Sequence, residues 1–168
     1  MRPLTLIALP LVLSACNDKP SEAEVAAETA KAVESVERAN NQAPLLIEVV
    51  PEAIEFSDIE THDLFGQSCN YSPGTGPSVR VIAREADAFM KVDGEILRFA
   101  ADPGSRELPM RSRSLYNGLE YSLRLAVEGE GVDLGEEAES TQYEGTVWLR
   151  DRWDRVVYTG TGQANCGV

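Results

Sequence analysis

The 168-residue sequence has few of the residues on which most enzymes and metal centres depend. It contains one histidine, His62, and three cysteines, and it lacks a G-x-S-x-G motif. A Ser-His-Asp hydrolase therefore has no support in the sequence. One imidazole without a second histidine or a free thiolate is also a poor transition-metal site. We expect a protein that is not an enzyme and that carries no cofactor.

Long hydrophobic runs are equally scarce. The one candidate, residues 4–13, follows Arg2 and is far shorter than the roughly 20 apolar residues that a membrane-spanning helix requires. A cation followed by a short apolar stretch is typical of an export signal. Any membrane attachment should then come from something other than a transmembrane helix.

The next residues, Leu13-Ser14-Ala15-Cys16, resemble the lipobox of bacterial lipoproteins. The resemblance implies that residues 1–15 are a signal peptide and that Cys16 becomes a lipidated, palmitate-bearing N-terminus. Each buried acyl CH₂ contributes about 0.8 kcal/mol, so two or three chains would anchor the protein firmly. Asn17, in place of the aspartate that retains such proteins in the inner membrane, favours the outer membrane facing the periplasm. The alternative is an ordinary secretory signal followed by an accidental cysteine.

Basic residues are in deficit. Fifteen Lys and Arg face twenty-eight Asp and Glu, which gives a net charge of −13, and loss of Arg2 with the signal would make it one unit more negative, −14. An acidic surface repels phosphate backbones and attracts basic partners, so we expect no nucleic acid partner and allow for a basic envelope protein. Solubility alone is the alternative explanation.

The segment 16–44 is predicted to be a helical tether. Residues 17–43 include no aromatic residue and no glycine, and Ser21 and Glu24 have the spacing of a capping box. This predicts a helix over about residues 22–39. Its larger apolar side chains are only three valines, too few for a broad buried stripe, so we expect the helix to be solvated.

Residues 45–168 are long enough for one domain, and their pattern has period two. The clearest alternation predicts a strand whose apolar face is formed by Leu119, Tyr121, Leu123, Leu125 and Val127. Asp93-Gly94, between two strand-like runs, predicts a hairpin with a type I′ turn. Further strands are expected at 79–83, 146–150 and 155–159, with weaker candidates at 45–50 and 53–56. The fold class is therefore all-β, a small antiparallel β-barrel or sandwich preceded by a helical tether.

Cys69 and Cys166 remain once Cys16 is assigned to lipid. An exported protein meets an oxidising compartment, so we expect these two to form a disulfide that ties the start of the β domain to its end. Two free buried thiols are the alternative.

Three further groups are candidates for binding. Asp58 and Glu60 would share a face with His62 if this segment were a strand, although a polar edge or loop without metal is favoured. A run of acidic residues could bind calcium, although a solvated loop is favoured because EF-hand spacing is absent. Trp153, between Arg152 and Arg155, could anchor a partner, since tryptophan and arginine dominate binding hot spots, although a ring folded back over the end of the barrel is favoured. The acidic run comprises Glu128, Glu130, Asp133, Glu136, Glu137 and Glu139.

The order of features also resembles the membrane-bound inhibitors of C-type lysozyme. The shared features are the lipid anchor, a small β domain, Cys69-Asn70-Tyr71, the element Gly118-Leu119-Glu120-Tyr121 and the late Cys166. Asn117 stands where that family has a serine, and Glu120 stands where a small or basic residue is usual. The prediction is thus a membrane-anchored, non-enzymatic binding or structural module of the cell envelope, and the alternative is an inhibitor of a basic C-type lysozyme.

Overall fold

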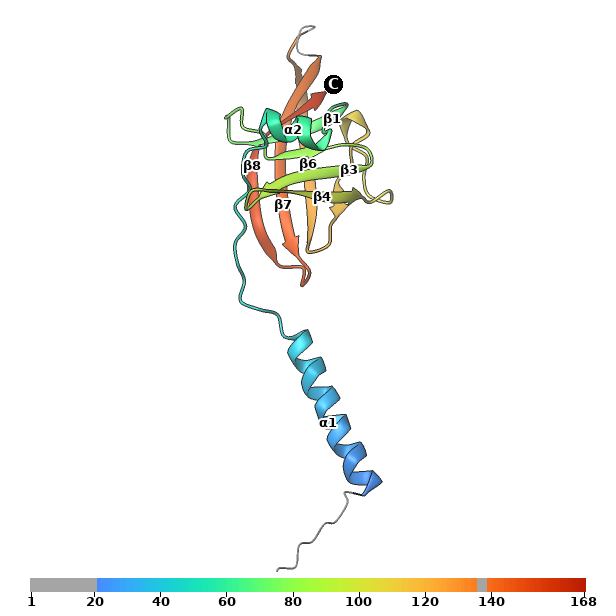
Figure 1. The fold of residues 1–168 in the computed structure, drawn as a ribbon. Helices are drawn as coiled ribbons and strands as arrows, with labels where there is room; N and C mark the ends of the chain where they lie inside the picture. The colour runs from blue at the N-terminus through green and yellow to red at the C-terminus, as the bar shows by residue number, and fades with distance from the viewer. Residues whose placement is uncertain (1–20, 136–138) are drawn as a thin grey trace, which may run out of the picture. The chain divides into compact units, whose positions relative to one another are not determined.

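The computed structural model describes residues 21–135 and 139–168 of the chain. The predicted signal peptide and the predicted lipidation site, Cys16, lie outside the described residues. Contacts divide the chain into two compact units, Met1–Pro44 and Leu45–Val168, which we describe separately. Figure 1 shows the helix of the first unit and the barrel of the second.

Helix α1, Glu22–Asn41, begins at the predicted capping box. The Ser21 side chain accepts from the Glu24 backbone N–H at 3.3 Å, and the Glu24 carboxylate accepts from the Ser21 N–H at 2.8 Å. Every residue of α1 is exposed, as expected for a helix without a broad apolar stripe. Within residues 21–135 and 139–168, no helix is both long and apolar enough to cross a membrane.

The second unit is an all-β domain, as predicted, and the sheet closes into an antiparallel barrel. Each strand pairs with its neighbours in the chain, and the last strand pairs with the first, which is an up-and-down arrangement. A 3₁₀-helix, Pro109–Arg111, lies between the fourth and fifth strands. The strands are β1 (Ser68–Pro73), β2 (Val81–Ala83), β3 (Asp87–Val92), β4 (Glu95–Ala101), β5 (Leu115–Asn117), β6 (Tyr121–Asp133), β7 (Ser140–Asp151) and β8 (Val156–Gly167).

The β3–β4 hairpin confirms the turn that was read from Asp93-Gly94. Both residues have positive φ, 49° and 79°, as a type I′ turn requires. Asparagine, aspartate and glycine adopt this conformation most readily, so these two residues position the hairpin locally.

The barrel interior is filled by one apolar cluster that all the long strands supply. Leu123 and Leu125 of β6 are fully buried, as the alternating pattern predicts. The Cys69–Cys166 disulfide is present and also fully buried within this cluster. The largest fully buried side chains are Tyr71, Tyr116, Phe99, Met90, Leu123, Leu125 and Leu149.

Two weak strand predictions are wrong. Helix α2, Phe56–His62, begins where a strand was expected, and it also replaces the polar edge or loop expected around His62. The Glu55 N–H donates to the Asp58 carboxylate at 2.8 Å, which caps the helix start. Residues 45–50 form no strand either, because they add one backbone hydrogen bond to the barrel, Val49 N–H to Val157 O at 2.9 Å.

Helix α2 belongs to a second, smaller apolar cluster on the outer surface of the barrel. Ile82 and Phe89 alternate with the interior residues of β2 and β3, so their side chains point outwards. They are buried there with Ile54 and Leu64, and Ile59 of α2 packs against them. This burial explains why a seven-residue helix is held in place.

Part of the acidic run lies on a strand, although a solvated loop was expected. Glu128, Glu130 and Asp133 lie on β6, which continues along β7 past a register shift between Glu128 and Val132. Glu128 and Asp133 join the strand because they pair with Glu144 and Thr141 of β7, beyond the end of the apolar pattern. The calcium alternative also involves Glu136 and Glu137, which lie outside the described residues.

Candidate functional site

Three turns gather at one end of the barrel. The β3–β4 turn at 93–94 brings the start of β4 beside the β5–β6 turn at 118–121, and the two line one hollow of about 440 Å³. The β5–β6 turn and the β7–β8 turn at 151–155 line a second hollow of about 290 Å³. We call this end the three-turn end.

The β5–β6 turn projects its central side chain fully into solvent. The Gly118 N–H donates to Tyr121 O at 2.8 Å, which leaves Leu119 and Glu120 as a two-residue turn. Leu119 is 103% exposed, so the prediction that it lies on the apolar face of the strand is wrong. The strand begins only at Tyr121, and period-two alternation does not mark where a strand starts.

Gly118 lies close against the barrel core. A Cβ there would lie 3.0 Å from Phe99 Cδ1 and 3.0 Å from Tyr121 O. Phe99 is almost completely buried. The absence of a side chain at Gly118 therefore lets the Phe99 ring support the turn directly.

Carboxylates surround Tyr121 at this end. Its pKa is raised, first by burial and then by the negative charges of Glu120, Asp93 and Asp151. These three charges come from the three different turns. The three-turn end is thus an acidic rim around a partly buried tyrosine and an exposed leucine.

The β7–β8 turn is built around Asp151. Its Oδ1 accepts from the backbone N–H groups of Trp153 and Arg155, both at 2.9 Å, and its Oδ2 accepts from Arg155 Nε at 2.7 Å. Burial would raise the pKa of Asp151, but the hydrogen bonds to Arg155 and Trp153 outweigh it and lower the pKa. The carboxylate thus stays charged and fixes the turn.

The structure brings together Trp153, Arg152 and Arg155, the residues predicted to bind a partner. The two guanidinium carbons lie 4.7 Å and 5.2 Å from the centroid of the half-buried Trp153 ring. Such cation–π contacts contribute about 0.5–1 kcal/mol each at exposed sites. They pre-order the tryptophan, and Arg152 also lines the hollow beside Leu119. Partner binding by these three residues stays a prediction.

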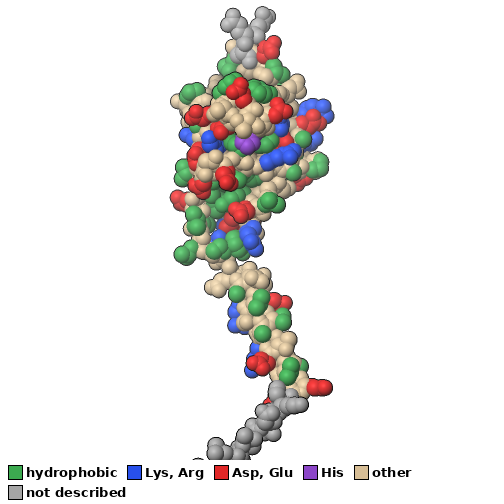
Figure 2. All heavy atoms as spheres, viewed as in Figure 1, with side chains coloured by type: hydrophobic (Ala, Val, Ile, Leu, Met, Phe, Trp, Pro, Cys, Tyr) green, Lys and Arg blue, Asp and Glu red, His purple; other side chains and the backbone are tan. Residues whose placement is uncertain are grey.

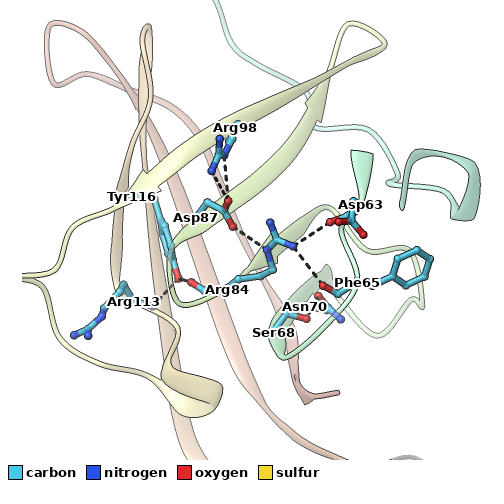
Figure 3. Close-up of polar contacts among 9 residues, drawn as sticks. All are labelled: Asp63, Phe65, Ser68, Asn70, Arg84, Asp87, Arg98, Arg113 and Tyr116. Atoms are coloured by element: carbon cyan, nitrogen blue, oxygen red, sulfur yellow. Dashed lines mark hydrogen bonds and ion pairs between the residues drawn. The ribbon is translucent and has the colours of Figure 1, made fainter. Parts of the chain in front are cut away.

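An ion-pair network around the buried carboxylate of Asp87 links β3, β4 and the segment after α2. Asp87 on β3 accepts from Arg84 Nε at 2.8 Å and from Arg98 Nη2 at 2.9 Å, and both guanidinium groups reach it in Figure 3. Arg84 also donates to the carbonyl oxygens of Asp63 and Phe65 after α2. Sequence reasoning missed this network, because it depends on the pairing of β3 with β4.

Tyr116 links the same network to the barrel interior. Its hydroxyl donates to Arg84 O at 2.8 Å and accepts from the Arg113 N–H at 2.6 Å (Figure 3). Burial, the largest influence, raises the pKa of Tyr116 to about 12. The phenol therefore remains a neutral hydrogen-bond donor at physiological pH.

The other predicted residues do not form a metal site in the described part of the chain. His62 ends α2 and lines a polar hollow of about 340 Å³ with Arg84, Asp87 and Arg98. Asp58 instead binds Lys91, with Oδ2 2.8 Å from Nζ. Among residues 21–135 and 139–168, no group of three or more His, Cys, Asp or Glu side chains is placed to hold a metal ion.

Comparison with known proteins adds no relative. No protein-family model, no curated protein and no solved structure matches this chain. The class of protein is therefore defined by the fold alone, an eight-stranded antiparallel barrel closed by a disulfide. Figure 2 shows acidic and basic side chains interspersed over the face of the barrel that it presents, so charge alone does not mark a site on that face.

Proposed function

We propose that this chain is a lipid-anchored, non-enzymatic binding module of the bacterial envelope, whose three-turn end contacts a basic protein. Leu119 is the observation that carries the proposal. A single exposed leucine is ordinary on protein surfaces. This one stands at the tip of a two-residue turn closed by a backbone hydrogen bond, and it lines a hollow on each side. Such a tip and its hollows suit a protein partner that has a matching concave and convex surface.

The charge around Leu119 favours a basic partner. Three carboxylates at this end, Asp93, Glu95 and Glu120, take part in none of the ion pairs formed within the described part of the chain. Arg152, which lines the hollow beside Leu119, is in none of them either, so the carboxylates outnumber it three to one. Uncompensated carboxylates at a rim accelerate association with a cationic protein and disfavour acidic ones. The net charge of −13 acts in the same direction.

The anchor and the tether fit this role. Lipid on Cys16, as the lipobox resemblance implies, would fix the first unit to a membrane from which the barrel can engage other envelope components. Asn17 after the lipobox-like residues favours the outer membrane facing the periplasm, and the proposal includes this location. An enzymatic role is not part of the proposal.

Inhibition of a basic C-type lysozyme is the second candidate. One observation favours it. The element Gly118-Leu119-Glu120-Tyr121, on which the resemblance to lysozyme inhibitors depends, forms the exposed turn at the three-turn end. An exposed, protruding turn is a suitable shape for entering an enzyme cleft.

Titration of the purified full chain with a C-type lysozyme tests both candidates. We expect a complex at low salt that weakens as salt rises, because exposed charge pairs are screened. Glu120→Lys should weaken it at least tenfold, whereas Glu34→Lys on α1 should not. Binding with loss of lysozyme activity supports the inhibitor, and binding without it supports the module alone. A complex that Glu120→Lys leaves unchanged would contradict the proposed site.

A further inference from the structure

Strand β4 is paired along its whole length on one side only. Its pairing with β3 covers six residue pairs, from Asp87↔Ala100 to Val92↔Glu95. Its pairing with β5 covers only Ala100↔Asn117 and Ala101↔Tyr116. Within the described strands, the first half of β4 therefore has an open edge, although the barrel closes at the other end of the strand.

The turn at Asp93-Gly94 determines which backbone groups face this open edge. In a two-residue hairpin the flanking residues, here Val92 and Glu95, form a hydrogen-bonded pair, and such pairs alternate along the strand. Glu95, Leu97 and Phe99 therefore bond to β3. The N–H and C=O groups of Ile96 and Arg98 point away from β3.

The hydrogen bonds at the far end of β4 agree with this alternation. The Ala101 N–H donates to Ala86 O, on the β3 side, at 2.9 Å. The next residue, Asp102, donates its N–H to Leu115 O, on the β5 side, also at 2.9 Å. The backbone N–H and C=O groups of odd-numbered β4 residues thus point towards β3, and those of even-numbered residues point towards the β5 side.

A hollow lies beside the open edge of β4, between residues 95–99 and the turn that follows β5. Its volume is about 440 Å³, and Leu97, Phe99, Gly118 and Tyr121 contribute to its lining. Alternate side chains of an added strand would point into it, because successive side chains of a strand point to opposite faces. The Arg98 guanidinium donates to the buried Asp87, which ties this part of β4 to β3.

We propose that this edge of β4 accepts an extended cationic segment of the basic partner as an added strand that continues the line of β5. The inference rests on the proposed function and specifies how the partner is held. Main-chain hydrogen bonds to Ile96 and Arg98 provide affinity, as in other cases of strand addition. The carboxylates of Asp93, Glu95 and Glu120 border the edge and select positive side chains.

A second copy of this chain is a less suitable occupant. Pairing two β4 edges would bring the acidic borders of both copies together, and like charges across a strand pair are destabilising. The segment that fits is therefore extended and alternates cationic with apolar side chains.

The test uses the full chain and a labelled seven-residue peptide of alternating lysine and valine. Ile96→Pro removes the N–H at the open edge without removing a bond to β3, and proline is tolerated on edge strands. Ile96→Val is the matched control that keeps the N–H. We expect the parent chain and Ile96→Val to bind the peptide and Ile96→Pro to bind at least tenfold more weakly. A peptide N-methylated at its lysine amides, which pair with Ile96 and Arg98 when the valines point into the hollow, should also bind at least tenfold more weakly than the unmodified one.

Amide hydrogen exchange provides a readout that does not require the proline variant to fold. The Ile96 and Arg98 amides should exchange at least tenfold more slowly when the unmodified peptide is bound. Unchanged exchange, or equal binding by a folded Ile96→Pro variant, overturns the strand-addition proposal. A dimer whose protection maps to β4 also overturns it. If lysozyme binding remains sensitive to Glu120→Lys in any of these cases, the proposed function stands without strand addition. If it does not, both proposals fail.

Discussion

Cys69 on β1 and Cys166 on β8 lie directly opposite each other in the strand pair that closes the barrel. Their disulfide spans a sequence separation of 97 residues and joins the first strand to the last. Because both cysteines are fully buried, the covalent link and the apolar core reinforce the same seam.

Removing this link should destabilise the barrel more than any surface change. Chain entropy alone would assign about 4.7 kcal/mol to a loop of about 100 residues, and measured losses are typically about 2–5 kcal/mol. We expect a loss in that range for the paired variant Cys69→Ala with Cys166→Ala, measured by urea unfolding. Addition of reductant should lower the urea midpoint of the parent chain and leave that of the variant unchanged. Equal midpoints for the two proteins without reductant would contradict the expectation.

Asp87 should be the most sensitive charged residue of the barrel. It is 4% exposed, and Asp87→Asn removes the charge that two guanidinium groups share. Charge-assisted hydrogen bonds to a buried group suggest a loss of about 2 kcal/mol in the free energy of unfolding. Glu34→Gln is the control, because the Glu34–Arg38 pair on α1 is mostly exposed, and such pairs contribute about 0.5 kcal/mol or less. Similar losses for the two variants would contradict the role of Asp87.

The Asp58–Lys91 ion pair makes stability depend on pH in the acid range. The hydrogen bond from Lys91, and then that from the Glu55 N–H, holds the pKa of Asp58 below its ordinary value. A carboxylate with a lowered pKa stabilises the fold above the unfolded value of about 4 and loses this effect as pH falls through the folded value. Asp58→Asn should therefore be less stable than the parent at neutral pH, and the difference should shrink below about pH 4.

Glu60→Gln is the matched control for Asp58, since Glu60 lies on the same helix and is exposed. Its unfolding midpoint should follow the parent at every pH. A gap between Asp58→Asn and the parent that is the same in acid and at neutral pH would show that the ion pair does not cause the dependence.

The proposed anchor depends on the thiol of Cys16. We expect mass spectrometry of the mature protein to find an N-terminal cysteine bearing acyl chains, and Cys16→Ser to leave the membrane fraction. Two or three buried chains are enough for stable attachment, and no chain is left in the variant. An unacylated mature N-terminus, or a variant that still sediments with membranes, would refute lipidation.

Local sequence signals predicted the elements that local chemistry determines. Ser21 and Glu24 cap a helix within four residues, and Asp93-Gly94 forms a turn that needs no distant contact. The disulfide between Cys69 and Cys166 followed from the chemistry of an oxidising compartment. In each case the deciding interaction involves neighbouring residues or a pairing with few alternatives.

Elements that depend on distant neighbours were missed. Strand β1 has no alternating apolar pattern, and it is a strand because β8 pairs with it over six residues. The short strand β5 and the far part of β6 likewise depend on their partners. The burial of Ile82 and Phe89 beneath α2 could not be read from period-two alternation, because β2 and β3 are covered on both faces there.

The candidate site was predicted only in pieces. Residues 118–121 were singled out by a family resemblance, and Trp153 was singled out by its arginine neighbours. That the two turns share a hollow requires the β6–β7 register, which pairs Tyr121 with Asp151. Registers of this kind are set by the whole barrel and not by either segment alone.

Photo-crosslinking from position 119 in intact cells is the most direct test of the three-turn end. The control position is Val168, which is 66% exposed and lies at the other end of β8 from the β7–β8 turn (Figure 1). We predict an adduct with a basic envelope protein from position 119 that position 168 does not give and that Glu120→Lys reduces at least fivefold. Equal adducts from both positions, or an adduct that Glu120→Lys leaves unchanged, would contradict the account.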